Sequence, residues 1–183
     1  MKKKKNKKAK NFIYPYSNIT FNYLKVFDIM ETDNIAQKNK ISIGLIIDNN
    51  ELNKNPIFPS EIKEEILNSP YYLLIFISRE DVVKISCFPT KKENIKKILV
   101  KLKEFSPDLV KGISNVLNEL NLSKEILHTT GLCYEMEKCF YETYLIGDLV
   151  DSGELTVEKI KDKFLSVANV ISVLIEDIPT LKE

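Results

Sequence analysis

Residues 95–117 read IKKILVKLKEFSPDLVKGISNVL, and this stretch decides the fold class. A helix is expected to begin in its second part, because Ser106 is a typical N-cap, Pro107 suits the first helical position and Asp108 adds an acid to the first turn. The first part, residues 95–102, fits a helix or a strand by its pattern alone. We expect a strand there, since the following helix has its own start signal at Ser106.

The rest of the C-terminal half alternates between strand and helix patterns. Residues 126–134 and 139–146 are two strand-like runs that flank a polar turn, and they predict a hairpin. Thr156 is the expected N-cap of a second helix, and residues 171–176 are expected to form the last strand. The resulting order, strand–helix–strand–strand–helix–strand, is that of the ferredoxin-like fold, an antiparallel sheet with two helices on one face.

The first half predicts a smaller, β-rich α+β domain. Its strand patterns lie at residues 18–27, 41–47, 71–78 and 82–88. Ser60 is the expected N-cap of a short helix, with Ile62, Ile66 and Leu67 as its apolar stripe. We place a domain boundary in the polar stretch near residue 92. The chain is therefore expected to be α+β, with a tail at 1–10, an N-terminal domain at 11–92 and a ferredoxin-like domain at 93–183.

The charge is divided unevenly along the chain. The whole sequence has 27 Lys and Arg against 26 Asp and Glu, but residues 1–10 read MKKKKNKKAK. Without the seven lysines of that tail, 20 basic residues face 26 acidic ones. An acidic body argues against a domain that coats nucleic acid. We expect at most a weak contact of the tail, Lys2 to Lys10, with nucleic acid or an anionic membrane surface, and we favour a solvated tail.

Localisation is predicted from three absences in the sequence. No apolar run reaches the roughly 18–20 residues of a membrane span, so no span is expected. No apolar stretch follows the charged start, so no secretory signal is expected. The cysteines, Cys87, Cys133 and Cys139, are too few for a disulfide framework. We therefore expect free thiols and a reducing, cytoplasmic location.

The sequence offers little to an enzyme or a metal. His128 is the only histidine, and in a strand it points to the opposite face from Cys133, five residues away. No close pair of zinc ligands such as C-x2-C exists, and no glycine-rich phosphate loop is present. We expect no catalytic residue, no metal and no cofactor, and hence a protein that is not an enzyme.

Two further features of the predicted hairpin have alternative interpretations. Gly131 interrupts a strand, which indicates either close approach of a ligand or partner backbone, or a β-bulge. Tyr134, Phe140, Tyr141 and Tyr144 have acidic neighbours, so core or interface packing is favoured over base stacking.

Two segments resemble a known family. Residues 105–117, FSPDLVKGISNVL, resemble the strand-to-helix segment of ACT domains, where D-x-P-G-x-L precedes a helix with I-S-x-V-L. Residues 164–173, FLSVANVISV, are similar to the ACT ending of a helix, a short turn and a last strand. The resemblance covers residues 95–178. It implies a regulatory module that binds an amino-acid-like effector and forms a homodimer through sheet faces or edges.

The resemblance also implies a ligand site at the start of the predicted helix. Ser106 and the amides of Asp108 and Leu109 would donate hydrogen bonds, with Phe105 beside them and Ser123 as a further polar contact. Asp108 stands where the family usually has glycine, and its charge would repel a ligand carboxylate. A structural or adaptor protein with a ligand-free ACT-like domain, binding a protein partner through its N-terminal domain, is therefore the alternative.

Overall fold

The computed structural model describes residues 42–54, 57–66, 68–79, 82–134, 138–149 and 155–181. The chain divides after Lys40, and all of these residues belong to the unit Ile41–Glu183. The predicted tail at 1–10 and the predicted strand at 18–27 lie outside the described residues.

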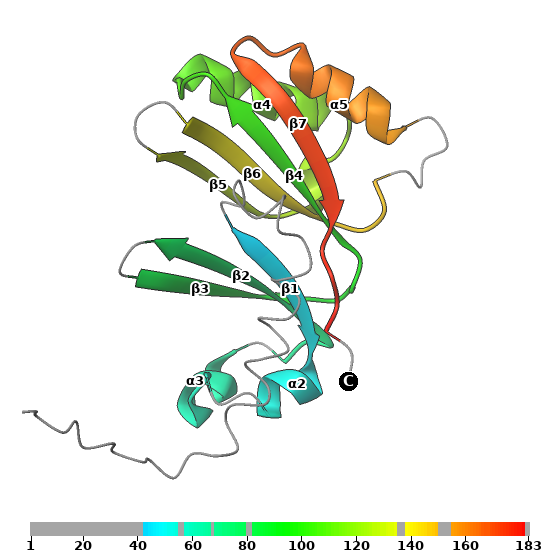
Figure 1. Ribbon diagram of the computed structural model, residues 1–183. Helices are drawn as coiled ribbons and strands as arrows, with labels where there is room; N and C mark the ends of the chain where they lie inside the picture. The colour runs from blue at the N-terminus through cyan, green and yellow to red at the C-terminus, as the bar shows by residue number, and fades with distance from the viewer. Residues whose placement is uncertain are drawn as a thin grey trace, which may run out of the picture. The chain divides into compact units, whose positions relative to one another are not determined.

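A three-stranded antiparallel sheet comes first, in the order β1–β2–β3 (Figure 1). Its strands are β1 (Ile43–Asp48), β2 (Tyr71–Arg79) and β3 (Val82–Thr90). The predicted strand and hairpin are thus confirmed. β2 is apolar on both faces from Tyr72 to Ile75, as expected for a central strand covered on both sides. Pro89 does not end the hairpin, because β3 is an edge strand, where a residue without an N–H is tolerated.

Two short helices accompany this sheet, and neither was predicted in full. α2 (Asn49–Lys54) directly follows β1 and was not predicted, and the Asp48 Oδ1 atom accepts a hydrogen bond from the Glu51 amide at 2.8 Å. α3 (Ser60–Glu65) was predicted, but its N-cap is Pro59 and no side chain caps it. The expected apolar stripe is also wrong for Ile62, which is 44% exposed.

A four-stranded antiparallel sheet follows, in the order β5–β6–β4–β7 (Figure 1). Its strands are β4 (Ile95–Leu102), β5 (Ile126–Tyr134), β6 (Lys138–Ile146) and β7 (Val170–Asp177). The helices are α4 (Pro107–Glu119) and α5 (Val157–Leu165), with a short 3-10 turn, η2 (Ser123–Glu125), before β5. The protein is therefore α+β with two antiparallel sheets, and the expected strand at residues 95–102 is confirmed.

Local signals explain where the two long helices begin and end. The Ser106 hydroxyl accepts a hydrogen bond from the Leu109 amide at 3.2 Å, and Thr156 accepts one from the Lys159 amide at 3.1 Å. Both predicted N-caps are confirmed. α4 ends before Asn121, whose φ of 57° is left-handed, a conformation that asparagine tolerates at a helix end.

Both long helices cover one face of the second sheet. Ile98, Val100 and Leu102 alternate along β4 and point to this face, as a half-covered strand requires. They pack against Ile113 of α4 and Phe164 of α5, and all five side chains are fully buried. This apolar core holds the helices on the sheet.

The opposite face of the second sheet packs on the first sheet. Ile95 and Tyr144 form a buried cluster here with Ile46, Leu73 and other residues. Gly44 of β1 allows the Ile178 side chain to pack closely against the backbone, because a Cβ atom at Gly44 would lie 2.9 Å from the Ile178 Cδ1 atom.

The segment after β7 ties the two sheets together. The Ile178 amide donates a hydrogen bond to the Ile95 carbonyl at 2.9 Å. The Ile46 amide donates one to the Pro179 carbonyl, also at 2.9 Å. Thr180 thereby forms a parallel bridge with Ile46 in β1. The predicted boundary near residue 92 falls between β3 and β4, and the division into domains 11–92 and 93–183 stays a prediction.

No helix in the part of the chain that the structure describes is long and apolar enough to cross a membrane.

Candidate functional site

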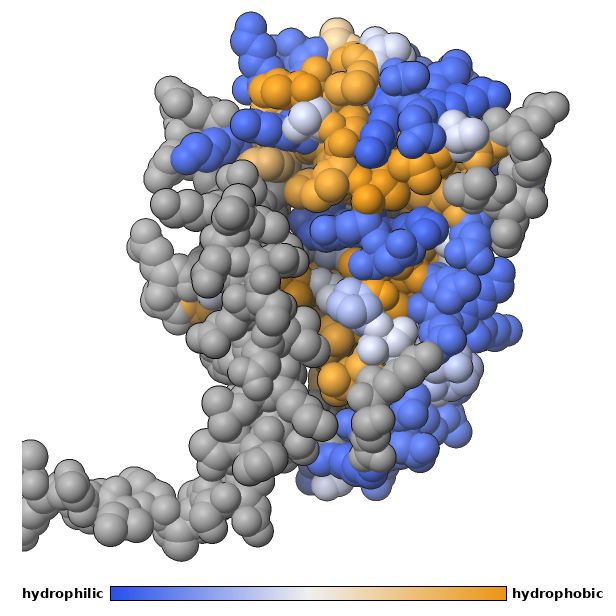
Figure 2. Space-filling model, turned by 45° about the vertical axis from the view of Figure 1, so that its right-hand side comes forward, coloured by the Kyte–Doolittle hydropathy of each residue, from blue (hydrophilic) through white to orange (hydrophobic). Residues whose placement is uncertain are grey.

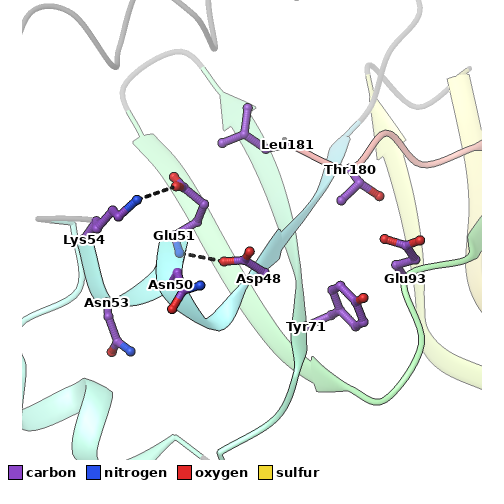
Figure 3. Close-up of a pocket in the computed structure, with 9 residues that line it drawn as sticks. All are labelled: Asp48, Asn50, Glu51, Asn53, Lys54, Tyr71, Glu93, Thr180 and Leu181. Atoms are coloured by element: carbon purple, nitrogen blue, oxygen red, sulfur yellow. Dashed lines mark hydrogen bonds and ion pairs between the residues drawn. The ribbon is translucent and has the colours of Figure 1, made fainter. Parts of the chain in front are cut away.

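A cavity of about 650 Å³ opens at one end of the first sheet (Figure 3). Its walls come from the end of β1, from α2, from the start of β2, from the β3–β4 connection and from the segment after β7. The lining residues are Asp48, Asn50, Glu51, Asn53, Lys54, Tyr71, Glu93, Thr180 and Leu181.

The fold brings these distant segments together for identifiable reasons. Asp48 and Tyr71 are paired in the register of β1 and β2, so both stand at the same end of the sheet. The Asp48 carboxylate accepts a hydrogen bond from the Glu51 amide at the start of α2, and Glu51 thereby joins the lining. Thr180 reaches the cavity because the segment after β7 forms backbone hydrogen bonds with Ile46 of β1.

The lining of the cavity is mostly polar and carries net negative charge. The lining contains three carboxylates, those of Asp48, Glu51 and Glu93, and one lysine, Lys54. The Lys54 Nζ atom lies 3.5 Å from the Glu51 Oε1 atom. Such a lining suits a small polar molecule with a cationic group, since carboxylates accept charge-assisted hydrogen bonds. Within the described residues, no group of three or more His, Cys, Asp or Glu side chains could hold a metal ion.

The residues suggested by the ACT resemblance lie elsewhere, at the start of α4. Ser106, Asp108 and Leu109 are adjacent there, but Leu109 is buried in the core below the helix. The Leu109 amide, expected to face a ligand, donates to the Ser106 hydroxyl instead. Asp108 is exposed to solvent. These residues begin a helix and form no wall of the cavity.

Ser123 is not brought to that place. It lies beyond the other end of α4, about 20 Å along the axis of a helix of this length. Its hydroxyl donates to the Asn118 side chain. The structure therefore joins Ser106, Asp108 and Leu109 and leaves Ser123 apart from them.

The position of the Phe105 ring accounts for a glycine at position 131. Neither of the two predicted interpretations of Gly131 holds. A Cβ atom at Gly131 would lie 2.4 Å from the Phe105 Cζ atom, so the glycine makes room for this ring. The register of β5 and β6 is regular at Gly131, and its irregularity falls between Ile126 and His128. The close approach is thus made by a side chain of the same chain.

Sequence reasoning missed a buried ion pair on the face of the second sheet that packs on the first sheet. Lys97 of β4 and Glu142 of β6 are each 1% exposed, and the Lys97 Nζ atom lies 2.9 Å from the Glu142 Oε1 atom. Glu176 of β7, partly exposed, lies 3.7 Å from the same nitrogen. A charged residue inside an apolar strand run, as Glu142 is in CFYETYLI, was the available signal.

Hydrogen bonds across the sheets complete this cluster. Ser42 directly precedes β1, and its hydroxyl donates a hydrogen bond to the Glu142 Oε2 atom at 2.7 Å. Since its proton is used there, the Tyr144 hydroxyl, 2.6 Å away, donates to Ser42. Lys97 donates to the Ser42 carbonyl at 2.9 Å. Burial, and next the charge of Glu142, raise the pKa of Tyr144, so it stays neutral as a donor.

His128 lies at the same junction of the two sheets. Its ring stacks on Phe88 of β3 with centroids 4.7 Å apart, and Tyr144 is 6.3 Å away. Burial first, and then Lys84, lower the pKa of His128, while Glu142 opposes them. The predicted opposite orientation of His128 and Cys133 is confirmed, because the disulfide partner of Cys133 belongs to the helix-side core.

The expectation of three free cysteines is wrong. Cys133 and Cys139 form a disulfide across β5 and β6. Register pairs these two residues directly, which places their sulfur atoms side by side. Cys87 is free, and burial raises the pKa of its thiol to about 11, so it is protonated and weakly reactive at neutral pH.

The aromatic hairpin packs as predicted where it is described. Phe140 and Tyr144 are buried, and Tyr141 is partly buried against the helix-side core. The side chain of Tyr134 lies outside the described part of the chain.

Comparison of the chain with protein-family models and with curated proteins found no match.

Proposed function

We propose that the protein is a non-enzymatic regulatory module that binds a small, amino-acid-like molecule and forms a homodimer. The cavity at the end of the first sheet is the observation that supports the binding of a ligand. Its volume, about 650 Å³, lies within the range of about 300–1,000 Å³ typical of small-molecule sites. The net negative charge of its lining favours the ammonium group of an amino acid or a related amine.

The strand order supports an ACT-like domain in the C-terminal half. In the second sheet, the first and last strands of the βαββαβ unit, β4 and β7, are neighbours, and both helices share one face. These are features of the ferredoxin-like arrangement to which ACT domains belong. We place the ligand in the cavity, because Phe105 and Ser106 at the start of α4 already have partners within the chain.

A thermal-shift screen of the full chain with amino acids and small amines tests the ligand. A ligand at a hundred times its Kd would stabilise the fold by about 2.7 kcal/mol. Asp48→Asn is the informative variant, since asparagine also caps a helix but removes one cavity charge. We expect the shift to shrink in this variant and to persist in Asp108→Asn at the start of α4. A screen without any shift would contradict the proposal.

Homodimerisation is proposed at the β7 edge of the second sheet. Within the part of the chain that the structure describes, β7 pairs with β4 alone, and its Ile171 and Leu174 side chains are 51% and 49% exposed. Figure 2 shows apolar side chains gathered on the upper part of the view, where the second sheet and its helices lie. Edge strands with exposed apolar residues favour pairing with another strand.

Charge favours antiparallel pairing of two β7 strands. In that arrangement the start of one β7 lies beside the end of the other. Lys101 and Lys103 lie near the start, through contacts with Ser172 and Asn169, and Glu176 and Asp177 lie at the end. Opposite charges would therefore face each other across the twofold axis.

Light scattering after size exclusion tests the dimer. Leu174→Lys should give a monomer, because two lysines would be buried near the axis. Val83→Lys is the matched control, since Val83 is 60% exposed on β3 of the other sheet. A wild-type monomer at every concentration, or a dimer that only Val83→Lys disrupts, would refute the β7 interface.

The adaptor function is the second candidate, and the contact between Phe105 and Gly131 favours it. This ring fills the space over Gly131 beside the start of α4, where the ACT resemblance implies a ligand, which fits a ligand-free ACT-like domain. Such a protein would bind a protein partner through its N-terminal half. A single partner captured at fixed stoichiometry by the full chain, together with no thermal shift in the screen, would support this function over the first.

A further inference from the structure

The Cys133–Cys139 disulfide joins two strands that are already paired by their backbones. Cys133 lies in the edge strand β5, and Cys139 lies opposite it in β6. Register pairs continue along the hairpin from Tyr134–Lys138 to Ile126–Leu145. The covalent bond closes a loop with a sequence separation of only six residues, and loop-closure entropy is small for short loops. The bond therefore restricts the unfolded chain less than a disulfide between distant segments would.

The two cysteine residues differ in their exposure to solvent. Cys133 is exposed, whereas Cys139 is 3% exposed and packs in the helix-side core. We therefore expect an external thiolate to attack at Cys133 rather than at Cys139. Accessible disulfides are the ones that exchange with thiols, because the attack needs an in-line approach to one sulfur.

We propose that Cys133–Cys139 is a reversible thiol–disulfide exchange site, in which Cys133 is the attacked sulfur and a dithiol is the reductant. One thiolate of the dithiol bonds to the Cys133 Sγ atom, and the Cys133–Cys139 bond breaks with its electron pair moving to Cys139. Cys139 takes up a proton. The second thiolate of the dithiol then attacks its own bridging sulfur and releases Cys133, so two electrons pass to the protein and the dithiol becomes a disulfide.

Thiol–disulfide exchange at this site would affect the contact between the Phe105 ring and Gly131. Gly131 and Cys133 are two residues apart on β5 and so share one face of the strand. The Phe105 ring rests on Gly131, directly before the cap of α4. Reduction frees the end of an edge strand beside this contact, so the loop before α4 becomes more mobile. In a reducing cytoplasm, disulfides are typically of this transient, redox-sensing kind.

Redox titration of the full chain tests the site, with graded mixtures of reduced and oxidised dithiothreitol and alkylation followed by mass spectrometry. We expect Cys133 and Cys139 to change together at one midpoint, with an unchanged circular dichroism spectrum. Amide exchange at residues 131–133 should accelerate about tenfold on reduction, as expected for local opening. The double variant Cys133→Ser/Cys139→Ser should exchange like the reduced protein under all conditions.

Cys87→Ser is the matched control, because Cys87 is free and lies in the other sheet; it should leave the midpoint and the exchange rates unchanged. Three results would overturn the proposal: both thiols alkylated in the oxidised protein, reduction only when the protein unfolds, or amide exchange at residues 131–133 that does not respond to reduction.

Discussion

The two faces of the second sheet are built on different principles, although β4 contributes to both. On the face under α4 and α5, Ile98, Val100 and Leu102 pack against helix side chains in an almost wholly apolar core. On the face toward the first sheet, the same strand presents Lys97, whose partner Glu142 is equally buried. An apolar core tolerates exchange of one apolar side chain for another of similar volume. A buried charge, in contrast, requires an opposite charge beside it. On the second face, hydrogen bonds of Ser42 with Lys97 and with Glu142 join this pair to the start of the first sheet.

The largest effect is expected from breaking the ion pair on one side. Lys97→Met leaves the Glu142 carboxylate buried without its counter-charge and should cost about 3–5 kcal/mol of unfolding free energy. Urea denaturation measures this loss.

Two comparisons make that result specific. The double variant Lys97→Met/Glu142→Leu should recover most of the stability, because no unpaired charge remains. Lys96→Met removes the neighbouring lysine, whose partner Asp177 is exposed, and should cost under about 1 kcal/mol. Equal losses in Lys96→Met and Lys97→Met would contradict the contrast between the two pairs.

On the helix-covered face, Ile113→Ala should cost about 2–4 kcal/mol in the same assay, since Ile113 is fully buried and leaves a cavity. Ile113→Val should cost only about 1 kcal/mol, because one methylene group is lost. Losses that scale with the volume removed would confirm that this face depends on packing alone. A Val variant as unstable as the Ala variant would argue for a specific contact.

Gly44→Ala tests the spacing of the two sheets. The added Cβ atom would lie 2.9 Å from Ile178 and 3.1 Å from Tyr144, so the side chains must move and about 1–2 kcal/mol should be lost. Gly112→Ala is the comparison on α4: its Cβ atom would lie 2.7 Å from the Val167 side chain, so a steric cost is expected there too, partly offset because alanine favours the helix. A Gly44→Ala protein as stable as the wild type would mean that the sheets are not closely apposed there.

The smallest effect concerns pH. The pKa of His128 is lowered in the folded protein, so the unfolded chain binds the proton more readily, and stability should fall as the pH drops through about 6.5 toward the lower folded value. Lys84 and Tyr144 face the ring, and Glu142 partly offsets the effect. Because the ring is partly exposed, the loss should stay under about 1 kcal/mol.

Denaturation at pH 7.5 and 5.5 measures this loss, and His128→Gln is the reference that lacks the titrating ring. The wild type should lose more stability between the two values than the variant does. An equal loss in both proteins would assign the pH dependence to other groups.

Local chemistry explains what could be predicted and what could not. Ser106 and Thr156 cap their helices through bonds to residues three positions away, so their roles are contained in short segments. The helix α2 escaped prediction, because Asp48 and Asn49 have the chemistry of a turn as well as of a cap, and six residues give no helical period. The Cys133–Cys139 bond depended on a hairpin register that a shift of one residue would have changed.

By itself, the sequence determined the α+β class, the strands and helices from residue 71 onward with their caps, and the face of the second sheet under the helices, because these follow from local hydrogen bonds and from periodicity. Only the tertiary structure decided that Lys97 is buried, that Phe105 rests on Gly131 and that the segment around Thr180 helps to enclose a cavity beside β1. Each of these joins residues that are distant in the chain, and no short-range pattern encodes such contacts.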